Sequence, residues 1–341
     1  MSVFSFGPSL VMPLVAQVPA AAPEPTLWHW LAFGAFVIVL LAIDLVVFHR
    51  DSHEPSLRES AIWTIVWCSI ALAFNGLIWV WRGPAIGIEF LTGYLVEWSL
   101  SMDNVFVFAV VFQFFGVPLK YQYRVLFWGI LGAIVMRLTF ILAGAALLER
   151  FDWALWIFGA FLIYTGVKLG LHSDAKVDPD RNILMRLAKR LFPVARESHG
   201  EKFFAVEDGR RCMTPLFLVL LVVESTDVLF AVDSVPAIFG VTKDAFTVFT
   251  SNIFAILGLR ALYFLLAGAI DIFRYLNYGL AAVLIFVGTK MVVEYWAGSH
   301  LVTPVGSLLI ILGLLGVSIV ASIIAKRREM SAEVSRPGAG Y

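Results

Sequence analysis

The stretch EWSLSMDNV at residues 97–105 matches a second stretch, DVLFAVDSV at residues 227–235, position by position. Each reads acid, two residues, apolar, small, apolar, Asp, small polar, Val, and each lies within a long apolar segment. The match continues in the pairs Arg137 with Arg260 and Gly166-Val-Lys168 with Gly288-Thr-Lys290. Each copy has three apolar segments, and because three is odd, the second copy would cross the membrane in the opposite orientation. We therefore expect an inverted repeat of three helices, an arrangement common in transporters. Chance similarity between apolar segments is the alternative.

Composition places this repeat in a membrane. The chain is 60% hydrophobic and 15% charged, whereas soluble domains are about half apolar and a quarter charged. Its apolar residues fall in blocks near the roughly 20 residues that cross a hydrocarbon core. The pattern predicts an all-α polytopic bundle with spans near 27–48, 60–81, 88–115, 123–147, 152–171, 213–239, 245–268, 272–296 and 303–325.

These spans divide the chain into seven parts. They are an N-terminal tail (1–26), two first spans (27–87), repeat unit one (88–171), a basic loop (172–211), repeat unit two (212–296), a last span (297–325) and a C-terminal tail (326–341). The N-terminal tail is either a Pro-rich tail or a cleaved signal that ends near Ala20-Ala21-Ala22.

Positive charge predicts the orientation. The loop between spans five and six carries nine Lys and Arg residues between 176 and 211, and such loops stay in the cytoplasm. Smaller basic clusters at Arg50, Lys120 and Lys326 fall on the same side, so we expect the N-terminus outside and the C-terminus inside. Ile183, Leu184, Leu187 and Leu191 recur at helical spacing in this loop, which predicts a helix on the inner membrane surface.

Five carboxylates lie inside the two matched spans, namely Glu97, Asp103, Glu224, Asp227 and Asp233. An ionised residue at the membrane centre costs about 2.5–3.5 kcal/mol, so five without partners would cost on the order of 12–18 kcal/mol. Arg137 and Arg260 can neutralise two of them. About three negative charges remain, which a divalent cation and a proton would balance. A buried network of ion pairs with the arginines is the alternative.

Helical spacing arranges the acids. Glu97 shares a face with Asn104, and Glu224 shares one with Asp227, whereas Asp103 and Asp233 lie about 120° from their acidic partners. Both could still point into one cavity if a helix is broken. We expect that break at Pro236, which offers no N–H to the carbonyl of Val232.

The ligand types predict a hard cation. Carboxylates, Asn104, Ser234 and backbone carbonyls suit Mn²⁺, Ca²⁺ or Mg²⁺, and no set of Cys and His with zinc or copper spacing is present. Asp44 in span one is either a vestibule ligand or part of an ion pair near His49 and Arg50. We expect no covalent cofactor, no enzymatic activity and no nucleic-acid partner. The sequence lacks a P-loop for ATP and the G-x-G-D of membrane aspartyl proteases.

The segments Glu97 to Asn104 and Glu224 to Pro236, with the Asp44 segment and the basic loop, resemble the TerC family over residues 27–325. The resemblance implies an inner-membrane protein of about nine spans, with links to tellurium resistance and, in Alx-like members, to manganese export. It also implies the metal-pathway positions Glu97, Asp103, Asn104, Glu224, Asp227, Asp233 and Ser234.

Two functions follow as expectations. The first is export of Mn²⁺ from the cytoplasm by alternating access of the two repeat units, with the direction taken from the resemblance. The second is a membrane partner that assists protein assembly or metal loading at the translocation machinery. The lipid bilayer is a partner in either case, and whether the chain forms a homo-oligomer stays an open question.

Overall fold

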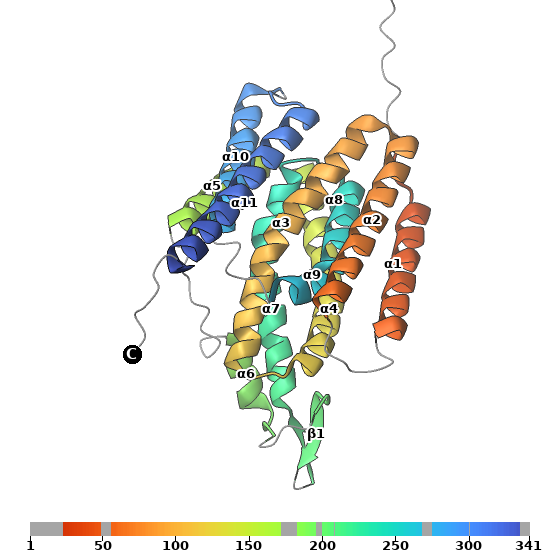
Figure 1. Ribbon diagram of the computed structural model, residues 1–341. Coiled ribbons are helices and arrows are strands. Elements are labelled where there is room, and N and C mark those ends of the chain that lie inside the picture. Colours follow the sequence, from red (N-terminus) through yellow and green to blue (C-terminus); the bar gives the residue numbers. More distant parts are fainter. Residues whose placement is uncertain are drawn as a thin grey trace, which may run out of the picture.

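The computed structural model describes residues 23–48, 56–171, 183–195, 200–207, 209–267, 275–299 and 301–334. Within these ranges helices dominate, and one β-hairpin stands at an end of the bundle (Figure 1). The elements are α1 (Leu27–Phe48), α2 (Leu57–Arg82), α3 (Pro84–Phe114), α4 (Leu119–Arg150), α5 (Ala154–Leu171), α6 (Ile183–Leu191), β1 (Phe204–Glu207), β2 (Arg210–Met213), α7 (Pro215–Phe239), α8 (Ala245–Leu257), α9 (Leu259–Ala267), α10 (Leu276–Ala297) and α11 (Pro304–Val334).

Nine helical segments in the described ranges are long and apolar enough to cross a membrane, so the predicted polytopic helical bundle is confirmed. Their ends agree with the predicted spans to within a few residues, except that α11 continues past residue 325 to Val334. The added turns read AKRREMSAEV, which is rich in strong helix formers. The last basic cluster therefore lies on a continuous helix.

Helix interruption occurs at a different place from the one we expected. Helix α7 runs through Pro236 to Phe239 without a break, so the proline removes one hydrogen bond donor but does not end the helix. The seventh span is interrupted instead, at Gly258 between α8 and α9. The N–H of Gly258 bonds to the carbonyl of Ile256, which tightens the end of α8.

Helices α5 and α10 pack in close contact through glycines. A Cβ on Gly159 would lie 2.8 Å from the carbonyl oxygen of Gly288, and one on Gly166 would lie 2.8 Å from that of Ala281. In the alignment of the two copies Gly166 corresponds to Gly288, and the same offset relates Gly159 to Ala281. The contact is therefore reciprocal, as at a two-fold axis. Small residues allow this approach between membrane helices.

The remaining helices of the two copies also exchange partners. Helix α3 of the first copy packs on α8 of the second, and α7 of the second packs on α4 of the first. This exchange agrees with a two-fold arrangement of the copies, and the inverted repeat itself stays a prediction.

Helix α1 is peripheral in Figure 1 and is held by aromatic rings. The ring centroid of Phe33 lies 5.8 Å from that of Phe254 on α8, which also meets Phe74 at 4.9 Å and Phe90 at 6.1 Å. Such ring pairs add about 0.5–1.5 kcal/mol each beyond their area burial. They fix α1 and α2 against the helices that carry the candidate site.

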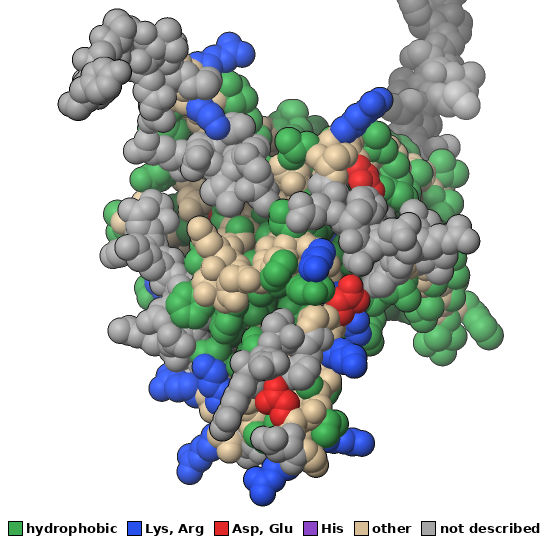
Figure 2. Space-filling model, turned by 60° about the horizontal axis from the view of Figure 1, so that its bottom comes forward, with side chains coloured by type: hydrophobic (Ala, Val, Ile, Leu, Met, Phe, Trp, Pro, Cys, Tyr) green, Lys and Arg blue, Asp and Glu red, His purple; other side chains and the backbone are tan. Residues whose placement is uncertain are grey.

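The β-hairpin and α6 mark one end of the bundle, which we call the hairpin end; the opposite end is the far end (Figure 1). The hairpin is antiparallel, with Ala205 paired to Cys212. The start of α4 joins it through a 3.4 Å ion pair between Arg124 and Glu201. Lys and Arg side chains surround the lower part of this end in Figure 2. The basic clusters at Arg124 and in the loop thus share one end, and its cytoplasmic location stays a prediction.

Candidate metal-ion site

Arg137 on α4 is the centre of a buried polar cluster. Its Nη1 donates to Glu97 on α3, and also to Ser234 Oγ on α7 at 2.8 Å and to Asn252 Oδ1 on α8 at 3.1 Å. Its Nη2 lies 3.7 Å from Asp227 Oδ1. We call these five residues the Arg137 network. Three predicted site residues and one predicted arginine therefore meet where both repeat units contribute helices.

Asn252 is a member of this network that our reading of the sequence missed. Its Nδ2 donates to Glu97 Oε2 at 3.1 Å while its Oδ1 accepts from Arg137, so one amide bridges both charges. The side chain is completely buried. A lone Asn within the apolar segment AFTVFTSNIFAIL was the available signal, because polar residues inside a membrane span usually face the bundle interior.

Several oxygens beside the network lack hydrogen bonds. Among the described residues, buried atoms without a partner include Asp227 Oδ2, Ser101 Oγ and Asn104 Oδ1. An unmade bond to a buried polar atom costs about 1–3 kcal/mol, so such atoms are rare unless something else binds them. All three can bind a hard cation, and Asn104 and Ser101 lie on the same face of α3 as Glu97.

Glu224 lies one turn of α7 before Asp227, against Gly132 of α4. A Cβ on Gly132 would collide with the Glu224 carboxylate, so only glycine leaves room for the acid there. The structure gives this carboxylate no hydrogen bond or ion pair among the described residues, and Asp227 is the charged neighbour that acts on it. Glu224 thus adds a third carboxyl group next to those of Glu97 and Asp227.

Asp103 and Asp233 lie apart from the network, as the 120° spacing indicates. Asp233 accepts a hydrogen bond from Thr165 of α5 at 3.3 Å, and Lys168 of the same helix is close enough to act on its charge. Asp103 is partly buried, and no ion pair or hydrogen bond to it is found within the described residues. In those residues no three His, Cys, Asp or Glu side chains converge into a preformed metal cage.

Arg260 has a different ion-pair partner from the one we expected. It pairs with Asp44 on α1 and donates to the hydroxyl of Tyr123 at 2.8 Å, with its guanidinium 4.3 Å from the centre of that ring. The prediction that Arg260 neutralises one of the five acids is therefore wrong, because its partner Asp44 is not one of them. Of the two readings of Asp44, the structure shows an ion pair, with Arg260 as the partner; His49 and Arg50 lie outside the described residues.

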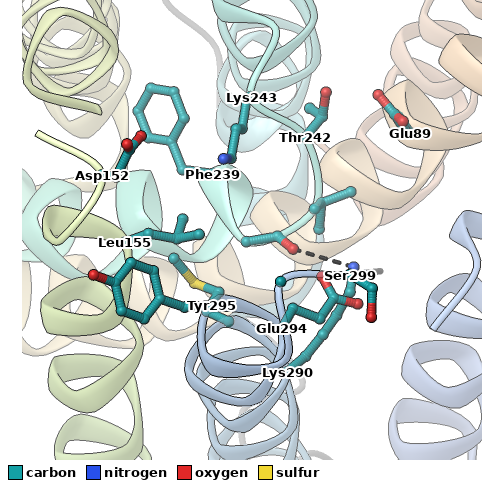
Figure 3. Close-up of a pocket in the computed structure, with 14 residues that line it drawn as sticks. Glu89, Asp152, Leu155, Phe239, Thr242, Lys243, Lys290, Glu294, Tyr295 and Ser299 are labelled. Carbon is teal, nitrogen blue, oxygen red and sulfur yellow. Dashed lines mark hydrogen bonds between the residues drawn. The ribbon is translucent and has the colours of Figure 1, made fainter. Parts of the chain in front are cut away.

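The far end holds a cavity of about 460 Å³ (Figure 3). Its lining includes Glu89 of α3, Asp152 before α5, and Lys290 and Glu294 of α10. The Lys290 ammonium donates to the carbonyl oxygen of Gly240, just after α7, at 3.3 Å, as the dashed line in Figure 3 marks. The Glu294 carboxylate accepts two backbone hydrogen bonds, from the N–H of Leu301 at 3.1 Å and from the N–H of Val302 at 3.2 Å. This cavity at the end of the bundle is therefore lined by charged side chains of both signs.

Another Arg–Asp pair, in which only the arginine is fully buried, lies near this cavity and joins the end of α2 to the residue that precedes α8. Arg82 donates to both carboxylate oxygens of Asp244, at 2.8 and 3.1 Å, and Asp244 caps α8 by accepting from the N–H of Thr247 at 2.7 Å. Burial alone would raise the pKa of Asp244, but the hydrogen bonds from Arg82 and Thr247 and the Arg82 charge outweigh burial. The pKa of Asp244 therefore lies below its ordinary value.

Known proteins that this chain resembles are described as membrane proteins. A model of the "Integral membrane protein TerC family" matches residues 82–330. An "Uncharacterized membrane protein STKORF319" of Myxococcus xanthus is 51% identical over 308 residues, which cover 90% of this chain and 96% of that protein. The "Putative membrane-bound redox modulator Alx" of Escherichia coli K12 is 47% identical over 279 residues, with 79% and 86% covered. No solved structure matches the chain.

Proposed function

The chain belongs to the TerC family of integral membrane proteins, and we propose that it transports a divalent metal cation, with Mn²⁺ as the substrate, out of the cytoplasm across the inner membrane. The Arg137 network and Glu224 are the intramembrane site in this proposal. It includes no enzymatic step and no covalent cofactor.

The charge balance at this site carries the proposal. Glu97, Asp227 and Glu224 contribute three carboxylates, and Arg137 contributes one guanidinium. Two negative charges are left when all are ionised, which is the charge of one divalent cation. The second buried arginine, Arg260, is matched by Asp44 and does not remove this excess. A hard cation would also satisfy the free oxygens described above.

The arrangement of the helices supports alternating access in this proposal. The site lies between helices of both predicted repeat units, and the far-end cavity would provide the route on one side. Asp233 and Asp103, which lie outside the network, would then bind the cation on its way into or out of the site. The outward direction comes from the family resemblance, and the basic hairpin end is cytoplasmic in this proposal.

Mn²⁺ uptake into proteoliposomes tests the site. We expect Glu97→Gln and Asp227→Asn to reduce Mn²⁺ flux by at least tenfold, because each removes one charge from the excess. Glu149→Gln is the matched control, since this exposed carboxylate at the end of α4 lies outside the network and does not line the far-end cavity, and it should keep most of the flux. Electron paramagnetic resonance of bound Mn²⁺ reports binding separately from transport.

Equal flux in wild type, Glu97→Gln and Asp227→Asn would remove the network as the transport site. Absence of Mn²⁺ binding and flux in the folded wild-type protein would remove the proposal altogether. Parallel measurements with Ca²⁺ and Mg²⁺ identify the preferred ion, because the oxygen ligands suit all three.

The name of the E. coli relative raises thiol chemistry as a mechanism. This chain has two cysteines, Cys68 within α2 and Cys212 in the hairpin, and both are free thiols. The Cys68 thiol accepts a hydrogen bond from Tyr94 at 3.3 Å, so it is part of the helix packing. Cys68 and Cys212 therefore do not form a dithiol, which favours metal transport over a thiol-based redox role.

The hairpin favours a second candidate function, that of a membrane partner. Phe204 and Val206 of β1 are exposed, and a cavity of about 740 Å³ beside them is also lined by Lys202 and Arg211. Exposed strand edges with apolar side chains commonly pair with other chains. Docking of another protein at this site would support a role in protein assembly. Val206→Asp would then abolish the docking while Mn²⁺ flux stays unchanged.

A further inference from the structure

The break in the seventh span places Arg260 next to a hinge candidate. Gly258 separates α8 from α9, and Arg260 is the second residue of α9. A Cβ on Gly258 would meet no atom closer than 3.6 Å, so there is room for a methyl group beside this glycine. Interrupted helices beside a membrane site commonly allow one half of a span to move.

Arg260 is held by two helices outside its own span. Its ion pair with Asp44 is buried, with relative exposures of 5% and 6% for the two side chains. Tyr123 on α4 adds a hydrogen bond and lies with its ring against the guanidinium. Both contacts join α9 to helices nearer the hairpin end, because Asp44 lies close to the end of α1 and Tyr123 close to the start of α4.

Two small cavities share Arg260 as a wall. One is also lined by Asp227 of the network and by Ala133. The other is also lined by Glu59 and Ser60, in the first turn of α2 at the hairpin end. Each holds about 10 Å³, which is room for about one water molecule. Arg260 therefore stands between the network and the hairpin end.

The spaces next to Arg260 are much smaller than the far-end cavity. That cavity holds about 460 Å³, while each space next to Arg260 has room for about one water molecule. The Arg260 side chain, which lines both small cavities, separates them, and its ion pair with Asp44 holds it in that position. Movement of α9 about Gly258 would withdraw this side chain and join the two small cavities.

We propose that Asp44, Arg260 and Tyr123 form a gate that closes the route between the hairpin end and the Arg137 network. The proposal rests on the transport function proposed above, and it adds the residues that block access to the network from the hairpin end. In the structure this gate is closed. Loss of its charges opens access to the cavity beside Asp227 without any change in the network itself.

Cysteine accessibility tests the gate without any metal. The reporter is Ala133→Cys, in a chain where Cys68 and Cys212 are replaced by serine. A membrane-impermeant, cationic methanethiosulfonate reagent is added to vesicles that expose the hairpin end. We expect slow labelling with the gate intact, and at least tenfold faster labelling in Asp44→Asn/Arg260→Gln, which removes both charges together and leaves neither unpaired.

The matched control is the pair of Arg82 and Asp244 at the far end, in which the arginine is buried and the aspartate is partly buried. Asp244→Asn/Arg82→Gln removes the same charges but lies away from both small cavities, so the reporter should label at the original rate. Tyr123→Phe keeps the ion pair and loses one hydrogen bond, and we expect a smaller, severalfold increase. That variant decides the question if the double gate variant does not fold, as judged by size-exclusion chromatography.

Fast labelling with the gate intact, or an unchanged rate in the folded gate variants, would overturn the gate. Mn²⁺ flux measured on the same proteins separates the two proposals. Faster labelling together with no Mn²⁺ flux in wild type leaves an access gate and removes the metal assignment. Flux that depends on Glu97, together with unchanged labelling, removes the gate alone.

Discussion

The glycine contact between α5 and α10 allows a quantitative test through Gly288→Ala. The new Cβ would lie 2.5 Å from the carbonyl oxygen of Gly159 and 3.0 Å from the backbone nitrogen of Ile163. Optimal separation between non-bonded heavy atoms is about 3.5–4.0 Å, so the two helices must move apart by roughly 1 Å. Overpacking of this kind costs about 1–3 kcal/mol.

Alanine also improves helix propensity, by about 0.5–1 kcal/mol relative to glycine. Gly313→Ala on α11 isolates this gain, because a Cβ there meets nothing within 4 Å. We therefore expect Gly288→Ala to be about 1–3 kcal/mol less stable than Gly313→Ala. Unfolding in mixed micelles with increasing dodecyl sulfate, followed by circular dichroism, measures the difference.

The double variant Gly159→Ala/Gly288→Ala extends the test. Both methyl groups require the same separation of the helices, so the double change should cost less than the sum of the single changes. If Gly288→Ala is as stable as Gly313→Ala, the close approach of α5 and α10 is wrong, and the reciprocal contact no longer supports a two-fold arrangement.

Three other predictions concern the site and the far end. Asn252→Leu should lower the free energy of unfolding by about 1–3 kcal/mol, because it removes two interhelical hydrogen bonds of about 0.6–1.7 kcal/mol each. Asn75→Leu is the control, since the buried amide oxygen of Asn75 has no hydrogen-bond partner, and this variant should be neutral or stabilising in the same unfolding assay. Gly132→Ala should displace the Glu224 carboxylate and reduce Mn²⁺ flux severalfold at unchanged protein yield; unchanged flux would mean that Glu224 has no part in transport. The lowered pKa of Asp244 stabilises the fold above the unfolded pKa of about 3.9, and this stabilisation is lost as the pH falls through the folded pKa. Asp244→Asn should thus be less stable than wild type at pH 7, and the difference should shrink as the pH falls below about 3.9, as thermal unfolding at neutral and acidic pH would show.

The spans were predictable because lipid imposes a simple rule on composition and length. The break at Gly258 was not predictable, since glycine occurs throughout these spans and this one lies between two leucines without a proline. Pro236 was the more obvious candidate. Helix α7 continues through it because the loss of one hydrogen bond does not force the chain out of helical geometry when neighbouring helices pack on both sides.

Within the site, matching the two copies predicted which acids belong together but not their partners. Glu97 and Asp227 occupy equivalent positions and meet the same arginine. Arg260 is the counterpart of Arg137 in the alignment, yet its partner is Asp44 on α1, a helix outside the repeat. Where α1 docks depends on tertiary packing of aromatic rings, which no spacing within the repeat encodes.

The pairing of Asp44 with Arg260 has a consequence for biosynthesis. The two residues are 216 positions apart, and ribosomes add about 5–20 residues each second, so Asp44 emerges roughly 10 to 40 s before its partner. During that interval α1 must enter the bilayer with a carboxyl group that has no arginine beside it. We expect Asp44 to be held near the headgroups until the seventh span arrives, which makes the docking of α1 a late step of assembly.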